Sequence, residues 1–288
     1  MALCLTTAVT LVPSTASAAP AGTFSAITYN VAGLPEPLSS APYPRLEAHL
    51  AIGARLAPYD VVNVQEDFNY HWALYWTDTH PYRTWSSGPV PFGSGLNTMA
   101  RHPVTDLKRV TWATCYINQA DCLTPKGFTY SRVKLADGVS FDLYNLHADA
   151  GDQEGDIKAR NAGLAQLTAY IAEHSAGRAV VIMGDTNARY TRPGENLSAF
   201  IRDNGLTDSW VALKQGGAEP TPTTPPAGCA PTAPDRCESI DKILYRGSPT
   251  LALTPATYAT PASEFLRDDG KPLSDHAPTT VAFTWTAR

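Results

Sequence analysis

The stretch Ala179-Val180-Val181-Ile182-Met183-Gly184-Asp185-Thr186-Asn187 decides the fold class. Its five consecutive apolar residues predict a strand buried on both faces, because a strand with one wet face would alternate apolar and polar positions. The run breaks at Gly184 and then presents an acid and an amide. Open α/β sheets collect their chemistry at strand ends of this kind. The stretch therefore predicts a layered α/β protein with a functional site at the edge of a buried sheet.

Strand and helix patterns alternate along the rest of the chain. Helical periodicity is clearest over 153–175, and weaker signals predict helices over 43–57 and from Glu195 to Asn204. Asp137-Gly138 is a hairpin signal between two strands. We therefore expect an α/β sandwich with sheets inside and helices outside. Besides 179–185, strands are predicted at 23–30, 60–66, 95–101, 127–135, 139–147, 240–246 and 278–286.

Composition and charge limit the function. The 288 residues are 43% hydrophobic and 17% charged, which suits one large core. The formal net charge is −5, whereas a sequence-independent duplex binder usually carries a basic footprint. This weighs against a nuclease without excluding one, because a bound divalent cation also attracts phosphate. No later stretch approaches the ~20 apolar residues of a spanning helix, so we expect no transmembrane segment, and a monomer.

The N-terminus predicts export. Met1 to Val12 is apolar and uncharged, and Ala16-Ser17-Ala18 is a small-residue cleavage pattern, although the usual basic opening segment is missing. We predict a secretory signal peptide over residues 1–18, cut after Ala18 rather than Ala19, and hence a secreted protein. Residues 19–288 then form a single catalytic domain. Within it, the six prolines of 216–236 predict a surface loop insertion.

Signal removal would leave four cysteines. An even number in an exported chain favours disulfides, and the spacing fits no familiar zinc site. Three pairings are possible, and the short-loop choices are Cys115 with Cys122 and Cys229 with Cys237.

Three polar residues lie at the ends of other predicted strands: Asn30, Glu66 and His147. Carboxylate and amide oxygens suit Mg²⁺, which keeps several waters and takes few protein ligands. Histidine can donate to phosphate and carry protons near neutral pH. Taken singly, Asn30 is equally explained as the start of a turn, Glu66 as a solvated strand end and His147 as a structural histidine.

The deciding stretch and the C-terminal strands add an acid–base set. Asp185 could orient or deprotonate water and Asn187 could donate to a phosphoryl oxygen, the alternative for this pair being an Asx turn. Asp241 lies in a β-like run and needs a partner if it is buried. His276, in Ser274-Asp275-His276, is the natural partner, because a carboxylate fixes the tautomer of a histidine.

Taken in order along the chain, these residues resemble the motifs of the endonuclease/exonuclease/phosphatase superfamily. The similarity runs from about residue 23 to 285 and rests on the whole series, not on any single motif. It implies a four-layered α/β sandwich, with two central mixed or antiparallel β-sheets flanked by helices. The series is Asn30, Gln65-Glu66, His147, Gly184-Asp185-Thr186-Asn187, Asp241 and Ser274-Asp275-His276.

The resemblance also implies the chemistry, which is phosphoester hydrolysis with Mg²⁺ or another divalent cation such as Mn²⁺ or Ca²⁺. Glu66 would be the main metal ligand, with Asn30 and Asp275 near the metal. Water would attack in line, and either His276 or Asp185 would take its proton. The catalytic residues implied are His147, Asp185, Asn187, Asp241 and His276.

Two stretches favour a phospholipid headgroup over nucleic acid. Residues 95–104 resemble the strand and turn of sphingomyelinase-like members, which makes Asn97 a candidate substrate-binding residue. Residues 121–127 resemble secreted sphingomyelinases, in which the equivalent of Lys126 would lie near the phosphate; an ordinary turn is the alternative. We therefore expect a sphingomyelinase-like or phospholipase C-like enzyme. A long aromatic hairpin that secreted sphingomyelinases often use is missing, so other headgroups stay open.

A deoxyribonuclease-like endonuclease acting on DNA or RNA is the alternative. It would keep the same catalytic residues but would need cations aimed at a groove. The available arginines are Arg45, Arg83, Arg101 and Arg189, which are scattered in sequence.

The aromatic segment 70–76 could reach a bilayer surface. However, Trp72, Tyr75 and Trp76 share one face of a helix, and we expect that face to be buried. Peripheral contact of the protein with a membrane surface stays open as the alternative.

Overall fold

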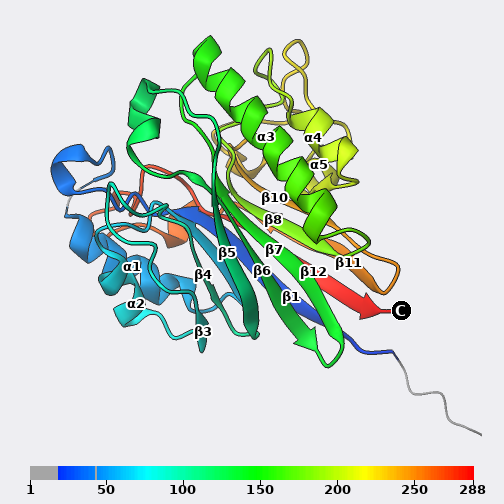
Figure 1. Ribbon diagram of the computed structural model, residues 1–288. Helices are drawn as coiled ribbons and strands as arrows, with labels where there is room; N and C mark the ends of the chain where they lie inside the picture. Colours follow the sequence, from blue (N-terminus) through cyan, green and yellow to red (C-terminus); the bar gives the residue numbers. More distant parts are fainter. Residues whose placement is uncertain (1–18, 43) are drawn as a thin grey trace, which may run out of the picture.

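Two six-stranded sheets pack face to face in the computed structural model, which describes residues 19–42 and 44–288 (Figure 1). The predicted signal peptide, residues 1–18, lies outside the described residues. The first sheet, in the order β11-β12-β1-β2-β4-β3, contains β1 (Ala21–Asn30), β2 (Val61–Gln65), β3 (Tyr82–Arg83), β4 (Asn97–Ala100), β11 (Leu251–Ala259) and β12 (Thr279–Ala287). The second, in the order β5-β6-β7-β8-β10-β9, contains β5 (Val104–Thr111), β6 (Gly127–Ala136), β7 (Val139–His147), β8 (Val180–Asp185), β9 (Thr207–Asp208) and β10 (Asp241–Arg246).

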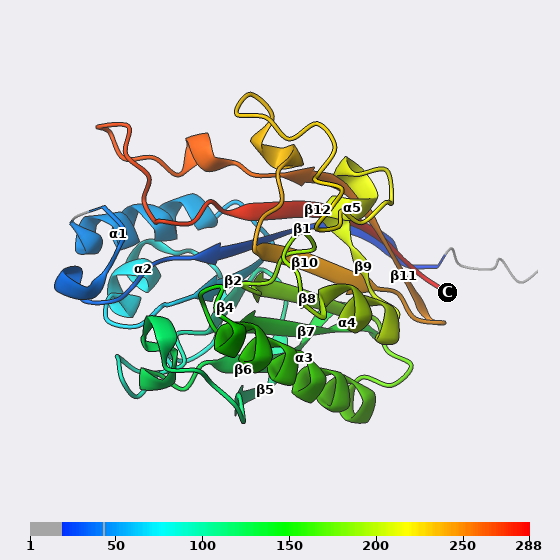
Figure 2. The same ribbon diagram turned by 90° about the horizontal axis from the view of Figure 1, so that it is seen from above.

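Helices cover the outer face of each sheet, which completes four layers (Figure 2). Two helices lie on the first sheet and two on the second, and the last, short helix contacts strands of both sheets. The α-helices are α1 (Arg45–Leu56), α2 (His71–Thr77), α3 (Glu154–His174), α4 (Leu197–Asp203) and α5 (Ser209–Lys214). Short 3-10 helices are η1 (Glu36–Leu38), η2 (Asn118–Leu123), η3 (Pro234–Arg236) and η4 (Ala262–Glu264). The predicted α/β sandwich is confirmed.

Alternation along β1 explains how one strand serves two cores. Ile27 and Tyr29 pack toward α1, whereas Phe24 and Ala26 face the second sheet. The Phe24 ring stacks on Phe141 of β7, with 5.2 Å between centroids. Because the period is two residues, Asn30 ends the strand on the face that points at the second sheet.

A polar layer between the sheets fixes their relative position near the ends of β2 and β7. The Gln65 side-chain nitrogen donates to Oδ1 of Asn145 at 2.7 Å, and the Asn145 amide donates to the carbonyls of Val64 and Asn97 at 3.0 Å each. Buried amides must be satisfied by specific partners, so these bonds permit one alignment of the sheets. The strand ends of both sheets are thereby held side by side.

Four strands were not predicted from sequence: β3, β5, β9 and β11. Most of β5 is exposed, so it lacks the buried run that marks β8. β11 contains Pro255, where its pairing with β12 is irregular. β3 and β9 have two residues each, too few for any periodicity.

The two short-loop cysteine pairings are both formed. Disulfides join Cys115 to Cys122 and Cys229 to Cys237. The second closes part of the proline-rich segment 216–236, which lies between α5 and β10 and contains η3. Within the described part of the chain, each helix is too short or too polar to cross a bilayer.

Candidate active site

Strand pairing brings three of the predicted catalytic residues into one row. In the second sheet, His147 at the end of β7 pairs with Asp185 at the end of β8, and Asp185 pairs with Asp241 at the start of β10. Neighbouring strands lie about 4.8 Å apart, so these side chains are adjacent by register alone. This explains why residues nearly a hundred positions apart can act together.

The first sheet supplies the opposite wall. The Asn30 side-chain nitrogen lies 3.1 Å from Oε1 of Glu66 and 3.2 Å from Oδ2 of Asp185. Glu66 has a left-handed backbone, with φ of 56°, directly after β2. Such a conformation is costly for a residue with a side chain and is typical of functional sites. Here it ends the strand alternation and lets Glu66 face the second sheet.

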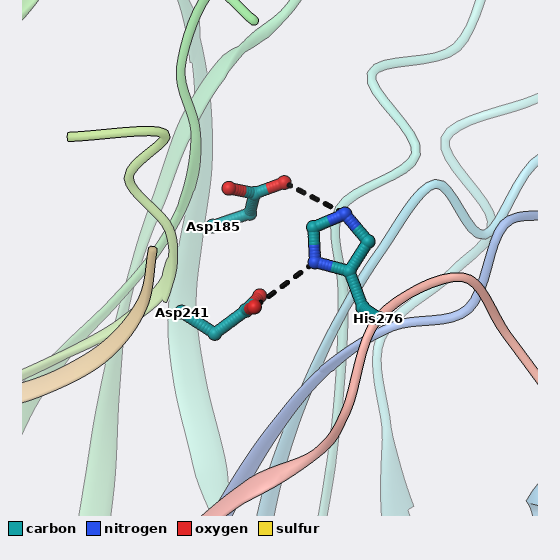
Figure 3. Close-up of side chains that lie close together, drawn as sticks. All are labelled: Asp185, Asp241 and His276. Atoms are coloured by element: carbon teal, nitrogen blue, oxygen red, sulfur yellow. Dashed lines mark hydrogen bonds and ion pairs between the residues drawn. The ribbon is translucent and has the colours of Figure 1, made fainter. Parts of the chain in front are cut away.

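His276 connects the two carboxylates of the second sheet (Figure 3). Its Nδ1 lies 2.9 Å from Oδ2 of Asp241, and its Nε2 lies 3.7 Å from Oδ2 of Asp185. His147 approaches from the other side, with its Nε2 3.4 Å from Oδ2 of Asp185 and 3.9 Å from Oε1 of Glu66. Asp241 and His276 are therefore in direct contact, and the orienting role of Asp241 stays a prediction.

Burial and charge separate the two histidines. Burial alone would lower the pKa of His276, but the carboxylates of Asp241 and Asp185 outweigh it and raise this pKa to about 11. Burial lowers the pKa of His147 well below its usual value, and Lys126 and His276 add to the effect. His276 is therefore a charged imidazolium at neutral pH in this arrangement, and His147 is neutral.

Burial acts in the opposite direction on the two acids. It raises the pKa of Asp185 to about 6, while His276 opposes the change. It also raises the pKa of Glu66, against the effects of Lys126 and Asn30. Carboxylates with raised pKa values gain from an added cation or can take up a proton near neutral pH.

Arg45 is a site-supporting residue that the sequence did not reveal. Its guanidinium is fully buried and donates to the carbonyls of Val31, Ala32 and Leu273, at 2.6, 3.1 and 2.7 Å. It thus connects the chain after β1 to the segment before Ser274. As the first residue of an amphipathic helix, Arg45 looked like a surface charge, so only tertiary structure could reveal this role.

The segment that carries His276 is held at a second point. The Ser274 hydroxyl donates to the carbonyl of Asn30 at 2.7 Å, and the same oxygen accepts from the amide of His276 at 3.3 Å. These bonds place the histidine next to the end of β1. Ser274 is therefore part of the structure that positions His276.

A pocket of about 390 Å³ opens beside this cluster. Glu66, Lys126 and His147 lie on its wall, together with apolar side chains from several loops. The Lys126 ammonium pairs with Asp121, which is buried, and lies 3.4 Å from the carbonyl of Ala148. Lys126 is therefore placed where a phosphate could reach it.

Asn97 and Asp275 lie outside the cluster. Asn97 is buried, donates to Asp67 at 2.7 Å and accepts from Arg109 at 2.8 Å. It does not line the pocket as the structure has it. The exposed Asp275 carboxylate accepts from the hydroxyls of Ser40 and Ser274, although its charge still raises the pKa of Glu66. Their predicted roles stay predictions.

Asn187 lies one step behind the catalytic row. Its backbone is left-handed, with φ of 50°, and its backbone amide donates to Oδ1 of Asp185 at 3.0 Å. Its side-chain nitrogen donates to the carbonyl of Ala148 at 3.1 Å. The Asx turn considered as an alternative is thus formed. A role in substrate contact would require this side-chain bond to open.

The residues fit a divalent cation at Glu66 better than elsewhere. Asp185, Asp241 and His276 offer ligand atoms within 4.8 Å of one another, but a charged imidazole bonded to Asp241 cannot bind a metal. Glu66 lines the pocket, and burial raises its pKa, so a cation bound there would stabilise the carboxylate. The Asn30 amide nitrogen faces Glu66 while its oxygen accepts from Ala32, so in this orientation Asn30 holds the carboxylate.

The prediction that the aromatic face of helix α2 is buried was wrong. Trp72 and Trp76 are 58% and 79% exposed. Helix α2 instead buries Ala73 and Leu74 against the first sheet, while Tyr75 bonds the carbonyl of Thr84. The small residues thus make the contact, and the tryptophans remain at the surface.

Comparison with known proteins shows the family of the chain. The profile of Endonuclease/Exonuclease/phosphatase family 2 matches residues 35–217. The sphingomyelinases of Mycobacterium tuberculosis and Mycobacterium bovis are 44% identical to the chain over 274 residues, covering 92% of it and 54% of the relatives. The chain therefore spans about half the length of the curated relatives it matches.

Solved structures with low sequence identity share the fold. TDP2 of D. rerio, complexed with a single-strand DNA product, superposes with a TM-score of 0.65 at 19% identity, covering 91% of this chain and 98% of that one. A beta toxin mutant from Staphylococcus aureus with bound magnesium ions gives 0.62 at 16% identity, covering 90% and 99%. At these identities the likeness concerns the architecture alone.

Proposed function

The chain belongs to endonuclease/exonuclease/phosphatase family 2, and from this membership we propose that it is a metal-dependent phosphodiesterase that hydrolyses a phospholipid headgroup. One observation carries the proposal. Asn30, Glu66, His147, Asp185 and His276 converge from both sheets within hydrogen-bond or ion-pair distance of one another. Such a set can bind a phosphoryl group and move a proton at the same place.

The reaction is the in-line attack of water on phosphorus. Mg²⁺ held at Glu66 would polarise a phosphoryl oxygen and offset its charge. Lys126 and the charged His276 attract the phosphate, and neutral His147 donates from Nε2. Because His276 already carries its proton, Asp185 takes the proton from water. The bond from phosphorus to the alcohol oxygen breaks, and His276, which Asp241 keeps oriented, gives its proton to that oxygen. Asn187 and Asn30 are proposed to position substrate and ligands, with Asp275 near the metal.

A lipid is supported over DNA by similarity and by the use of the arginines. The chain is 44% identical to sphingomyelinases. Of the four arginines considered for a nucleic-acid groove, Arg45 is buried, and Arg101 is engaged with the carbonyl of Ala57. Arg83 donates to the carbonyl of Tyr75 and Arg189 to that of Glu238. None of the four lines the pocket beside the cluster, which supports a lipid over a polyanion.

The two disulfides support an extracellular location. Two disulfides persist most readily in an oxidising environment, which supports the proposal that residues 1–18 are a secretory signal and that the enzyme acts outside the cell. We also propose that residues 19–288 form a single catalytic domain and that the protein is a monomer.

The test is a paired hydrolysis assay with Mg²⁺. Sphingomyelin vesicles and plasmid DNA are incubated separately with the protein, and His276→Ala serves as the blank. We expect release of a soluble phosphorylated headgroup from the vesicles and intact plasmid. Cleavage of DNA with no action on lipid would replace the proposal by the deoxyribonuclease-like alternative, and equal activity of the His276→Ala variant would refute the site.

A further inference from the structure

Three loops around the pocket mouth are almost free of charge. Residues 31–41, 84–96 and 113–124 all contribute to the pocket wall or flank residues that do. Their sequences contain only two charged residues. Glu36 accepts a bond from the backbone amide of Arg45 at 2.7 Å, and Asp121 is buried against Lys126. The outer surface of these loops therefore offers little to attract a polyanion.

The same loops expose large apolar side chains, which we call the apolar rim: Leu38, Phe92, Ile117 and Leu123. They are 68%, 80%, 62% and 60% exposed, in that order. Leu38 and Leu123 also line the pocket, and the other two lie within two residues of positions that do. Soluble proteins rarely gather exposed apolar side chains from separate loops at one place unless the place binds something.

Two of these loops are held in shape before anything binds. The Cys115–Cys122 disulfide closes the loop that carries Ile117. In the second loop, the amides of Phe92 and Gly93 both donate to the carbonyl of Pro89 at 2.9 Å, which forms a tight turn. Side chains presented on preformed loops lose little entropy on insertion.

We propose that the apolar rim enters the interfacial region of a zwitterionic bilayer and brings a lipid headgroup to the pocket, an inference that rests on the proposed function. A polyanion or an anionic membrane would call for basic residues on these loops, and they have none beyond the engaged Lys126 that follows them. A protein partner seated on the rim would close the pocket through which substrate must enter. An uncharged lipid surface needs no basic residues on the loops, and it supplies the substrate to the pocket instead of blocking it.

The experiment measures binding and catalysis separately. The protein is sedimented with phosphatidylcholine vesicles, and separately with phosphatidylserine vesicles, in the presence of a chelator, so that no turnover occurs. The test variant is Phe92→Ser/Ile117→Ser, which leaves the pocket wall and catalytic cluster untouched. The matched control is Trp76→Ser, because Trp76 is 79% exposed on α2, and α2 contributes no residue to the pocket. Hydrolysis of sphingomyelin vesicles and of the soluble diester bis-p-nitrophenyl phosphate is then compared.

We expect the wild-type protein and Trp76→Ser to bind alike, with little change between about 0.1 and about 1 M salt, where the Debye length falls from ~10 to ~3 Å. The double variant should bind vesicles about tenfold more weakly or worse. It should lose vesicle hydrolysis to a similar extent and keep hydrolysis of the soluble diester.

Two results would overturn the proposal that the apolar rim binds a zwitterionic bilayer. One is a double variant that binds vesicles as well as the wild type, and the other is wild-type binding only to phosphatidylserine vesicles or only at low salt. The proposed function fails separately, if the wild-type protein hydrolyses neither the soluble diester nor the vesicles; the chelator-based binding result still decides the rim.

Discussion

Asp241 and His276 form the pair on which the electrostatics of the site depend. Asp241 is 4% exposed, and its Oδ2 binds Nδ1 of His276, while its Oδ1 has no partner among the described residues. A buried carboxylate with so few partners is stabilised mainly by the imidazolium. The pair therefore sets both the orientation and the charge of the histidine.

Replacing Asp241 by Asn should lower the pKa of His276, because the Asp241 carboxylate is the main group that raises it to about 11. The histidine would then lose its charge at a lower pH, and turnover should fall by about 10²-fold or more. An NMR titration of the His276 ring follows the shift, and turnover is measured in parallel.

The matched control is Asp137→Asn, since Asp137 is a fully exposed acid in the turn between β6 and β7. It should change neither the titration nor the rate. An Asp241→Asn variant in which His276 titrates as in the wild type would show that the pair does not set the charge of the ring.

At the scale of elements, α1 has a second task beyond covering the first sheet. Its first residue, Arg45, donates to carbonyls of the chain after β1 and of the segment leading to His276. The buried guanidinium of Arg45 thus joins α1, the end of β1 and the C-terminal segment. Loss of that group should therefore affect stability and catalysis together.

Arg45→Met should lower the free energy of unfolding by about 3 kcal/mol, because several buried carbonyls would lose their donor. Activity at a temperature where the variant stays folded should also fall, as His276 loses support. Urea unfolding and turnover at low temperature measure the two effects. Arg202→Met, at an exposed position on α4, is the control; equal stability of both variants would contradict the account.

The elements themselves were largely readable from sequence. β8 and α3 carry strong periodic signals, and the catalytic residues follow strand ends, where pairing register brings them together. The four missed strands are short, exposed or interrupted by proline. Contacts made across sequence were not readable: the burial of Arg45, the exposed tryptophans of α2 and the placement of Asn97 all depend on which neighbour packs there.

At the scale of the whole molecule, the disulfides close loops of the second-sheet half of the fold. Cys229 and Cys237 are eight residues apart and precede β10, which begins at Asp241. Cross-linking a loop this short stabilises mainly by restricting the unfolded chain. The bond lies outside the catalytic cluster, so it should matter for stability and little for chemistry.

Cys229→Ser/Cys237→Ser should therefore lower the free energy of unfolding by about 2 kcal/mol and leave turnover unchanged at temperatures where the protein is folded. Thermal and urea unfolding measure the first effect, and an activity assay measures the second. Loss of turnover in the folded double variant would mean that this loop takes part in the site.

The whole account depends on a divalent cation acting at Glu66. The most direct measurement is headgroup release from sphingomyelin vesicles as Mg²⁺ is increased, with wild-type protein and the Glu66→Ala variant side by side. We predict a saturating dependence on Mg²⁺ for the wild type, loss on chelation, recovery when Mg²⁺ is restored, and no turnover by the folded variant. Headgroup release that is unchanged by the chelator, or full activity of the Glu66→Ala variant, would contradict a role for a divalent cation at Glu66.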